Sequence, residues 1–197
     1  MTSDTNVLGL VGRSLDQTCA IIAAISPGQA RLATPCPAWD VRALVRHVVG
    51  QDLRNFLVSA RGETADWQLP ADALGEDWVA EFRAAAAQLM DVWQAADLDH
   101  PVTMPGGGQA PLRGRADQQI AEFVVHGWDL ARATGQQADL DQALARRALS
   151  WSQQMLRPEF RGPDKAFGPE VAVPADAPIY QRLAGWFGRD PHWTPPG

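Results

Sequence analysis

Apolar residues recur every three or four positions in four long stretches of this chain, and this spacing restricts the possible folds more than any other feature. Residues three and four apart lie on one face of an α-helix, so each stretch predicts an amphipathic helix. Connections rich in Pro and Gly separate the stretches, and no run of alternating apolar and polar residues predicts a β-strand. The four helices are expected at about 4–25, 41–60, 74–96 and 115–134.

Four long amphipathic helices joined by moderate connections predict an all-α protein built as a four-helix bundle. Two shorter helices are expected after them, at about 140–156 and 178–188. The chain has 197 residues, 46% of them hydrophobic, which is enough for one well-buried core. We therefore expect a single domain over 1–197, with the bundle at about 4–156 and a C-terminal extension at about 157–197 that contains one or two extra helices.

The charge of the chain and its N-terminal residues argue against two classes of partner. The net charge is −6, from 17 basic and 23 acidic residues, and no basic cluster follows a predicted helix, so nucleic acid is not expected to bind. No stretch approaches the roughly 18 apolar residues of a membrane span, and the first residues lack the features of a secretion signal. We expect a cytoplasmic protein without a membrane partner.

The cysteines and the glycine-rich loop both have ordinary interpretations. Cys19 and Cys36 show no Cys-x-x-Cys spacing, so reduced thiols are expected, with Cys36 as a small packed residue. The segment 104–115, MPGGGQAPLRGR, lacks the Gly-Lys-Ser/Thr ending and the preceding strand of a phosphate-binding loop. Turn chemistry explains its glycines better.

The fourth predicted helix carries a pair of residues that can bind a metal. Glu122 and His126 are four positions apart, so a carboxylate oxygen and an imidazole nitrogen project from the same helix face. Helical pairs of this spacing bind zinc in hydrolases. The alternative is a pair without such a role, because a Glu/His pair at this spacing is also common on exposed helix faces.

A third ligand is available on the second predicted helix. His47 lies beside the apolar stripe of that helix, whereas His100 and His192 adjoin prolines in predicted turns and are expected in solvated loops. If the second and fourth helices are neighbours, His47, Glu122 and His126 form a two-histidine, one-carboxylate set with a free coordination position, as in catalytic zinc sites. Ligand identity alone leaves iron, nickel and manganese open, and a histidine beside an apolar face is often only a hydrogen-bonded structural residue.

Four further polar residues could support this site. Gln51 and Asp129 each follow a histidine by about one helical turn and could contact it or a substrate; Asp129 could instead pair with Arg132 or Arg46 on the surface. Asp52 falls inside the apolar stripe of its helix, so it needs a partner, either an arginine, a helix end or the metal ligands. Arg189 could anchor an anion in the pocket or clamp the C-terminal segment.

Three segments together resemble a known family. They are TPCPAWDVRALVRHVVG at 34–50, EFVVHGWDLARATG at 122–135 and LAGWFGRDPHW at 183–193. Their pattern is similar to that of the mycothiol-dependent maleylpyruvate isomerase N-terminal domain and its relatives in the DinB-like four-helix superfamily. The resemblance covers nearly the whole chain, and it implies that His47, Glu122 and His126 bind a divalent metal, usually zinc.

The resemblance also implies an activity. In the family the metal binds the sulfur of a low-molecular-weight thiol such as mycothiol, in other branches bacillithiol or glutathione, and the thiolate attacks an electrophile. The isomerase itself has an additional C-terminal domain that this sequence is too short to contain in full, so maleylpyruvate isomerisation is not expected here. What is expected to carry over is the metal centre.

Three hypotheses follow for the function. The first is a zinc-dependent thiol transferase or isomerase of the mycothiol type, with a thiol and a small electrophile as its partners. The second is a metal-dependent hydrolase or tailoring enzyme that needs no thiol. The third is a bundle that binds a metal or ligand without catalysis. A monomer or a homodimer is expected in each case.

Overall fold

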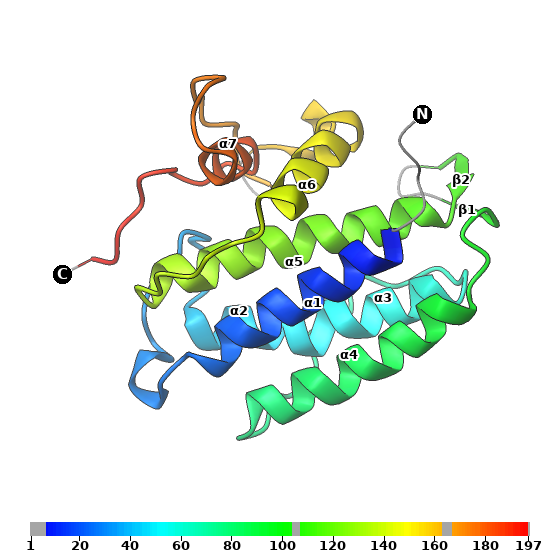
Figure 1. Cartoon of the computed structure of the whole chain (residues 1–197), viewed down its shortest axis with the longest axis horizontal. Helices are drawn as coiled ribbons and strands as arrows, with labels where there is room; N and C mark the ends of the chain where they lie inside the picture. The colour runs from blue at the N-terminus through cyan, green and yellow to red at the C-terminus, as the bar shows by residue number, and fades with distance from the viewer. Residues whose placement is uncertain (1–6, 104–106, 163–166, 197) are drawn as a thin grey trace.

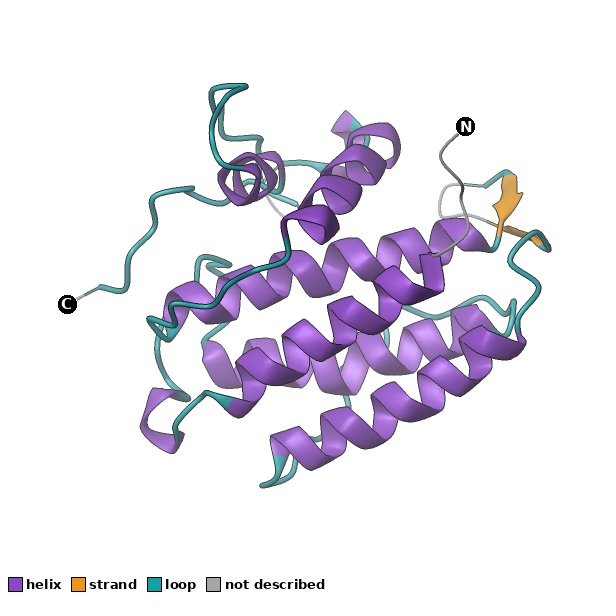
Figure 2. Cartoon of the chain, in the orientation of Figure 1, coloured by secondary structure: helices purple, strands orange, loops and turns teal. Residues whose placement is uncertain are grey.

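The computed structural model describes residues 7–103, 107–162 and 167–196. Their fold is an all-α four-helix bundle with a C-terminal extension (Figures 1 and 2). The helices of the bundle are α1 (Val7–Ala23), α2 (Val41–His47) with its continuation α3 (Leu53–Ala60), α4 (Trp78–Ala95) and α5 (Arg113–Ala133). Each predicted long helix is present, with ends within a few residues of the expected ones.

Helix α5 is the central element of the molecule. It packs against α1, α2 and α3 of the bundle, while α6 (Gln142–Met155) and α7 (Ile179–Trp186) cover another part of its surface. Figure 1 shows α5 between α1 below it and α6 above it. Its buried residues therefore include polar and charged side chains such as Gln119, His126 and Asp129 as well as the apolar ones.

Aspartate residues fix where three helices begin. The Asp40 side chain accepts a hydrogen bond from the Ala43 N–H at the start of α2, and Asp77 and Asp141 act in the same way at α4 and α6. Side-chain oxygens at this position satisfy backbone donors that have no partner within the helix. The cap at Asp40 sets the start of the helix that ends at His47.

The second predicted helix is not a uniform α-helix. Between α2 and α3 the turn η2 (Val48–Asp52) is π-helical, and the Leu53 N–H donates to the Val48 carbonyl five residues back. A π-turn contains one residue more than an α-turn and often marks a functional site. The prediction of one regular helix over 41–60 was wrong in this turn.

A short hairpin also departs from the prediction that no strand forms. Strands β1 (Pro101–Thr103) and β2 (Gln109–Pro111) pair antiparallel beside the start of α5 (Figure 2). Gly107 and Gly108, between them, have φ values of 86° and 82°, which glycine adopts without steric cost. Three residues are too few for an alternating pattern to be visible in the sequence.

The C-terminal extension returns to the bundle. Two short 3-10 turns, η1 (Pro27–Gln29) and η3 (Pro158–Phe160), complete the described elements. The Tyr180 hydroxyl of α7 donates to the Asp141 carbonyl, and the chain beyond α7 brings Arg189 back against α5. No helix in the described part of the chain is long and apolar enough to cross a membrane.

Candidate metal centre

The two histidines that were predicted to share a site lie side by side between α2 and α5. His47 is the last residue of α2, His126 lies in the second half of α5, and these helices pack together. The centroids of the two imidazole rings are 5.2 Å apart, with the rings nearly perpendicular. The structure thus brings together the two helices on which the predicted metal site depends.

Gln51 determines which ring nitrogen of His47 carries the proton. The Gln51 amide nitrogen donates to the carbonyls of Trp67 and Leu69, at 3.0 and 2.9 Å, so its oxygen must face the histidine. That oxygen lies 2.8 Å from His47 Nδ1 and accepts the Nδ1–H. The proton is therefore on Nδ1, and Nε2 has a free lone pair.

Asp129 fixes the proton of His126 in the same way. Its Oδ2 lies 3.1 Å from His126 Nδ1, and both carboxylate oxygens accept hydrogen bonds from Arg189. Burial favours the neutral acid, but the Arg189 charge and the His126 bond outweigh it and lower the pKa of Asp129. An ionised Asp129 accepts the Nδ1–H, which leaves Nε2 of His126 free as a ligand.

The surface partners considered for Asp129 were wrong. Arg46 donates to the carbonyls of Ala71 and Asp72, and Arg132 donates to the Trp193 carbonyl. Arg189 is buried and donates hydrogen bonds to Asp129 and to the Phe187 carbonyl, so its contacts favour the role of a clamp on the C-terminal segment.

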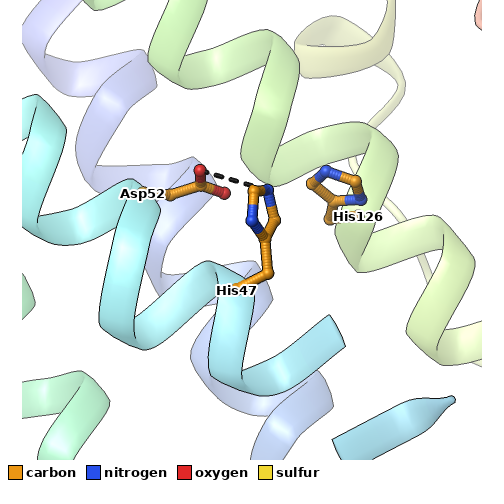
Figure 3. Close-up of side chains that lie close together, drawn as sticks. All are labelled: His47, Asp52 and His126. Atoms are coloured by element: carbon orange, nitrogen blue, oxygen red, sulfur yellow. Dashed lines mark ion pairs between the residues drawn. The ribbon is translucent and has the colours of Figure 1, made fainter. Parts of the chain in front are cut away.

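Two carboxylates face the Nε2 atoms of the histidines. Glu122 Oε2 lies 3.6 Å from Nε2 of His126, and Asp52 Oδ1 lies 3.3 Å from Nε2 of His47. One potential ligand atom each from His47, Asp52 and His126 lies within 4.8 Å of the others. Figure 3 shows the Asp52 carboxylate pointing at the His47 ring, with His126 approaching from α5.

Burial makes the charges of this cluster costly without a cation. Burial raises the pKa of Glu122. Burial and the neighbouring Glu122 charge together raise the pKa of Asp52 well above its usual value. Burial and the proximity of His126 lower the pKa of His47 to about 3, so His47 is neutral near pH 7. Two buried carboxyl groups beside two imidazoles whose Nδ1 atoms contact Gln51 and Asp129 are the donor set of a divalent metal site.

The loop before α2 covers the histidines. Trp39 stacks on His47 at 4.3 Å between ring centroids and meets His126 edge-on at 5.7 Å. The Thr34 hydroxyl holds this loop, because it lies 2.9 Å from the Cys36 carbonyl and 2.8 Å from the Trp39 carbonyl. The sequence indicated this Thr-Pro-Cys-x-x-Trp segment through the family resemblance, but the stacking of Trp39 on His47 was not predicted.

A cavity of about 400 Å³ opens beside the cluster. Cys36 lines it as an unpaired thiol, and burial raises its pKa, which favours the protonated form. The cavity is lined by Cys36, Ala38, Trp39, His47, Gln51, Asp52, Trp67, Gln68, Glu122, Val125, His126, Phe167, Phe187 and Arg189.

The other two histidines, His100 and His192, are exposed in loops, as expected.

Fold and site together define an all-α helical bundle with a histidine and carboxylate cluster between two of its helices. Residues 11–131 match the family described as the mycothiol maleylpyruvate isomerase N-terminal domain, and the chain belongs to this family.

Relatives and solved structures agree with this assignment. Two uncharacterized proteins of Mycobacterium tuberculosis, from two strains, are 32% identical over 186 residues, which cover 90% of this chain and 94% of each relative. The crystal structure of a mycothiol-dependent maleylpyruvate isomerase has a TM-score of 0.56 at 18% identity, and a histidine-to-alanine mutant of that isomerase has 0.57 at 17%. Each match covers 75% of this chain and 70% of the other, and at this identity it shows the shared fold.

Proposed function

We propose that the protein binds one divalent metal ion through His47, Glu122 and His126 and activates a low-molecular-weight thiol of the mycothiol type for attack on a small electrophile. Zinc is the expected ion, because two imidazoles and one carboxylate are a common catalytic zinc set. The observation that carries the proposal is the pair of contacts at Nδ1: Gln51 Oε1 and Asp129 Oδ2 each lie beside the Nδ1 of one histidine, and an Nδ1–H held there would leave Nε2 of each ring available to an ion.

The family supports the choice of a thiol as the second component. The solved structures that share the fold are described as mycothiol-dependent, and the chain belongs to the family of their N-terminal domain. A bound zinc ion would lower the pKa of a coordinated thiol, so that the nucleophilic thiolate forms near neutral pH. Among the described residues, Cys36 is the cysteine that lines this cavity, and burial raises its pKa, which favours the thiol over a competing thiolate.

The walls of the cavity indicate the kind of electrophile. Trp39, Trp67, Phe167 and Phe187 line the space beside the histidines, and a second, largely apolar hollow of about 160 Å³ shares Glu122 with it. Aromatic walls bind planar or apolar groups, and they exclude the water that would compete for a reactive substrate. A small electrophile with an apolar part suits this space.

Metal analysis of the purified protein, followed by a thiol-consumption assay, tests the proposal. We expect about one divalent ion per chain, lost in His47→Ala and Glu122→Ala but retained in His100→Ala, which removes an exposed histidine. With metal bound, a panel of small electrophiles should consume mycothiol. Turnover without any thiol would identify a hydrolase or tailoring enzyme instead, and bound metal without turnover would identify a non-catalytic binding protein.

A further inference from the structure

We propose that Asp52 is a fourth protein ligand of the metal ion, in addition to His47, Glu122 and His126. This inference rests on the metal centre of the proposed function and adds a residue to it. Three observations carry it: the state of the Asp52 oxygens, the distance from Asp52 to His47, and the π-turn that places Asp52 there.

The Asp52 carboxylate is buried without a hydrogen bond. The residue is wholly inaccessible to solvent, and neither carboxylate oxygen has a hydrogen-bond partner within the described part of the chain. Buried polar atoms almost always have partners, and an uncompensated buried charge is among the costliest features a fold can contain. A cation in this position would remove that cost.

The contact of Asp52 with His47 has the geometry of two ligands. Asp52 Oδ1 lies 3.3 Å from Nε2 of His47, but the His47 proton is on Nδ1, where Gln51 accepts it. Nε2 of His47 therefore faces an oxygen of a carboxyl group that has no hydrogen-bond partner in the described part of the chain, which is an arrangement that one cation could bridge. Ligands about 2.1 Å from one tetrahedral ion lie about 3.4 Å apart. The 3.3 Å of this pair and the 3.6 Å between His126 and Glu122 are both close to that value.

The π-turn explains why a residue five positions after His47 lies beside it. In an α-helix, residues five apart project about 140° from one another. The extra residue in η2, with its hydrogen bond from Leu53 to Val48, brings positions 47 and 52 to one side of the helix. A helix without this turn would aim Asp52 away from His47.

Four protein ligands still leave room for a sulfur. Catalytic zinc ions can become five-coordinate. The cavity beside the cluster provides the approach, since it is lined by His47, Asp52, Glu122 and His126 together.

A crystal structure of the zinc-loaded full chain tests the inference directly. We expect an Asp52 carboxylate oxygen within about 2.2 Å of the ion. An ion bound by the other three residues with both Asp52 oxygens more than about 3 Å away would overturn the inference and leave the proposed function intact. A chain that binds no ion at all would overturn both.

Two measurements on Asp52→Asn extend the test to solution, with Asp16→Asn, on the exposed face of α1, as the matched control. Zinc affinity, measured by competition with a chelator, should fall about tenfold or more in Asp52→Asn and stay unchanged in Asp16→Asn. The rise in melting temperature on adding zinc should be smaller in Asp52→Asn than in the parent and in Asp16→Asn, because the ion then binds the folded state less tightly. A lower melting temperature with unchanged zinc affinity would show that Asp52 supports the fold and is no ligand.

Discussion

At His47 and His126 the position of a single proton decides whether the ring can bind a metal. In each case an oxygen on the same helix, from Gln51 or Asp129, accepts the Nδ1–H and turns Nε2 toward the carboxylates. Ligand orientation by such neighbours contributes strongly to affinity in metal sites generally. Gln51 is itself held by two backbone carbonyls of the loop that contains Trp67, so this loop contributes to the orientation of His47.

Replacing Gln51 by alanine should weaken metal binding without removing a ligand. The Nδ1–H of His47 would lose its acceptor, so the ring could rotate or change tautomer, and affinity should fall about 10- to 100-fold. Competition with a chromogenic chelator measures this change. Gln94→Ala, which truncates an exposed glutamine on α4 away from the cavity, is the control; equal affinities in the two variants would show that Gln51 does not orient His47.

Asp129→Asn should destabilise the fold, because it leaves the buried Arg189 guanidinium without its counter-charge. Breaking one side of a buried ion pair costs about 3 kcal/mol or more. Urea unfolding of the parent and the variant at pH 7 measures the difference in the free energy of unfolding. A difference near zero would mean that Arg189 finds another partner.

The ion pair of Asp129 and Arg189 also predicts how the free energy of unfolding depends on pH. Arg189 and His126 lower the pKa of Asp129 in the folded state, so the unfolded state binds more protons as the pH falls below the ordinary value of about 3.8. The contribution of Asp129 is therefore fully present above that pH and is lost as the pH falls toward the lowered pKa. The stability difference between parent and Asp129→Asn should shrink over that acid range, and a difference that grows there would contradict the assignment.

Among the elements, the π-turn η2 contains the site residue Asp52 and also makes a close backbone contact at Gly50. Gly50 lies within this turn, its carbonyl accepts a hydrogen bond from the Asp72 N–H, and a Cβ at Gly50 would lie only 2.8 Å from backbone atoms of Asp72. The loop that holds Gln51 can approach the helix only because residue 50 has no side chain.

Gly50→Ala should therefore destabilise the protein by about 1–3 kcal/mol, because the backbone of the loop must move away. Gly12→Ala is the matched control in α1, where a Cβ would meet only the Met90 side chain at 3.9 Å. That change should be neutral or stabilising by up to about 1 kcal/mol. Urea unfolding measures both, and a Gly50→Ala variant as stable as the parent would show that the loop adapts freely.

The sequence predicted the elements well and their irregularities poorly. Apolar spacing located α1, α4, α5, α6 and α7, because burial of one face is what the spacing records. It could not reveal η2, since one extra residue in a turn shifts an apolar stripe too little to be noticed between Val48 and Leu53. The only local signal was Asp52 inside the stripe, which marked a carboxylate in need of a partner without identifying the turn that supplies one.

For the site, the sequence predicted the features that depend on helix spacing and helix packing, but not those that depend on the path of the loops and the extension. The pairing of Glu122 with His126 depends on positions within one helix, and the approach of His47 depends on two helices being neighbours; both could be anticipated. The partner of Asp129 could not, because Arg189 is 60 residues further along the chain and reaches α5 through the path of the extension. Trp39 over His47 likewise depends on how the Thr34 loop folds back.

At the scale of the whole molecule, the largest buried apolar side chains lie outside the lining of the candidate site. Large apolar side chains such as Phe56, Phe82, Trp93 and Phe123 are fully buried among α3, α4 and α5. The site occupies the contact between α2 and α5 and is closed by the extension through Arg189.

Removing the metal with a chelator should therefore lower the melting temperature while the helical circular dichroism signal stays. An ion that binds only the folded state adds about 2.7 kcal/mol when its free concentration is 100 times the dissociation constant. Thermal unfolding with and without zinc, followed in the far ultraviolet, measures this effect. Loss of the helical signal at 25 °C after chelation would instead indicate an ion that the fold requires.

The central claim is that the cluster of His47, Glu122 and His126 holds an ion that binds a thiol sulfur. The most direct measurement is the absorption spectrum of the cobalt-substituted protein during titration with mycothiol. A sulfur-to-cobalt charge-transfer band should appear and saturate at one thiol per ion, and it should be absent in His47→Ala. A cobalt-loaded protein whose spectrum stays unchanged at every thiol concentration would contradict the claim.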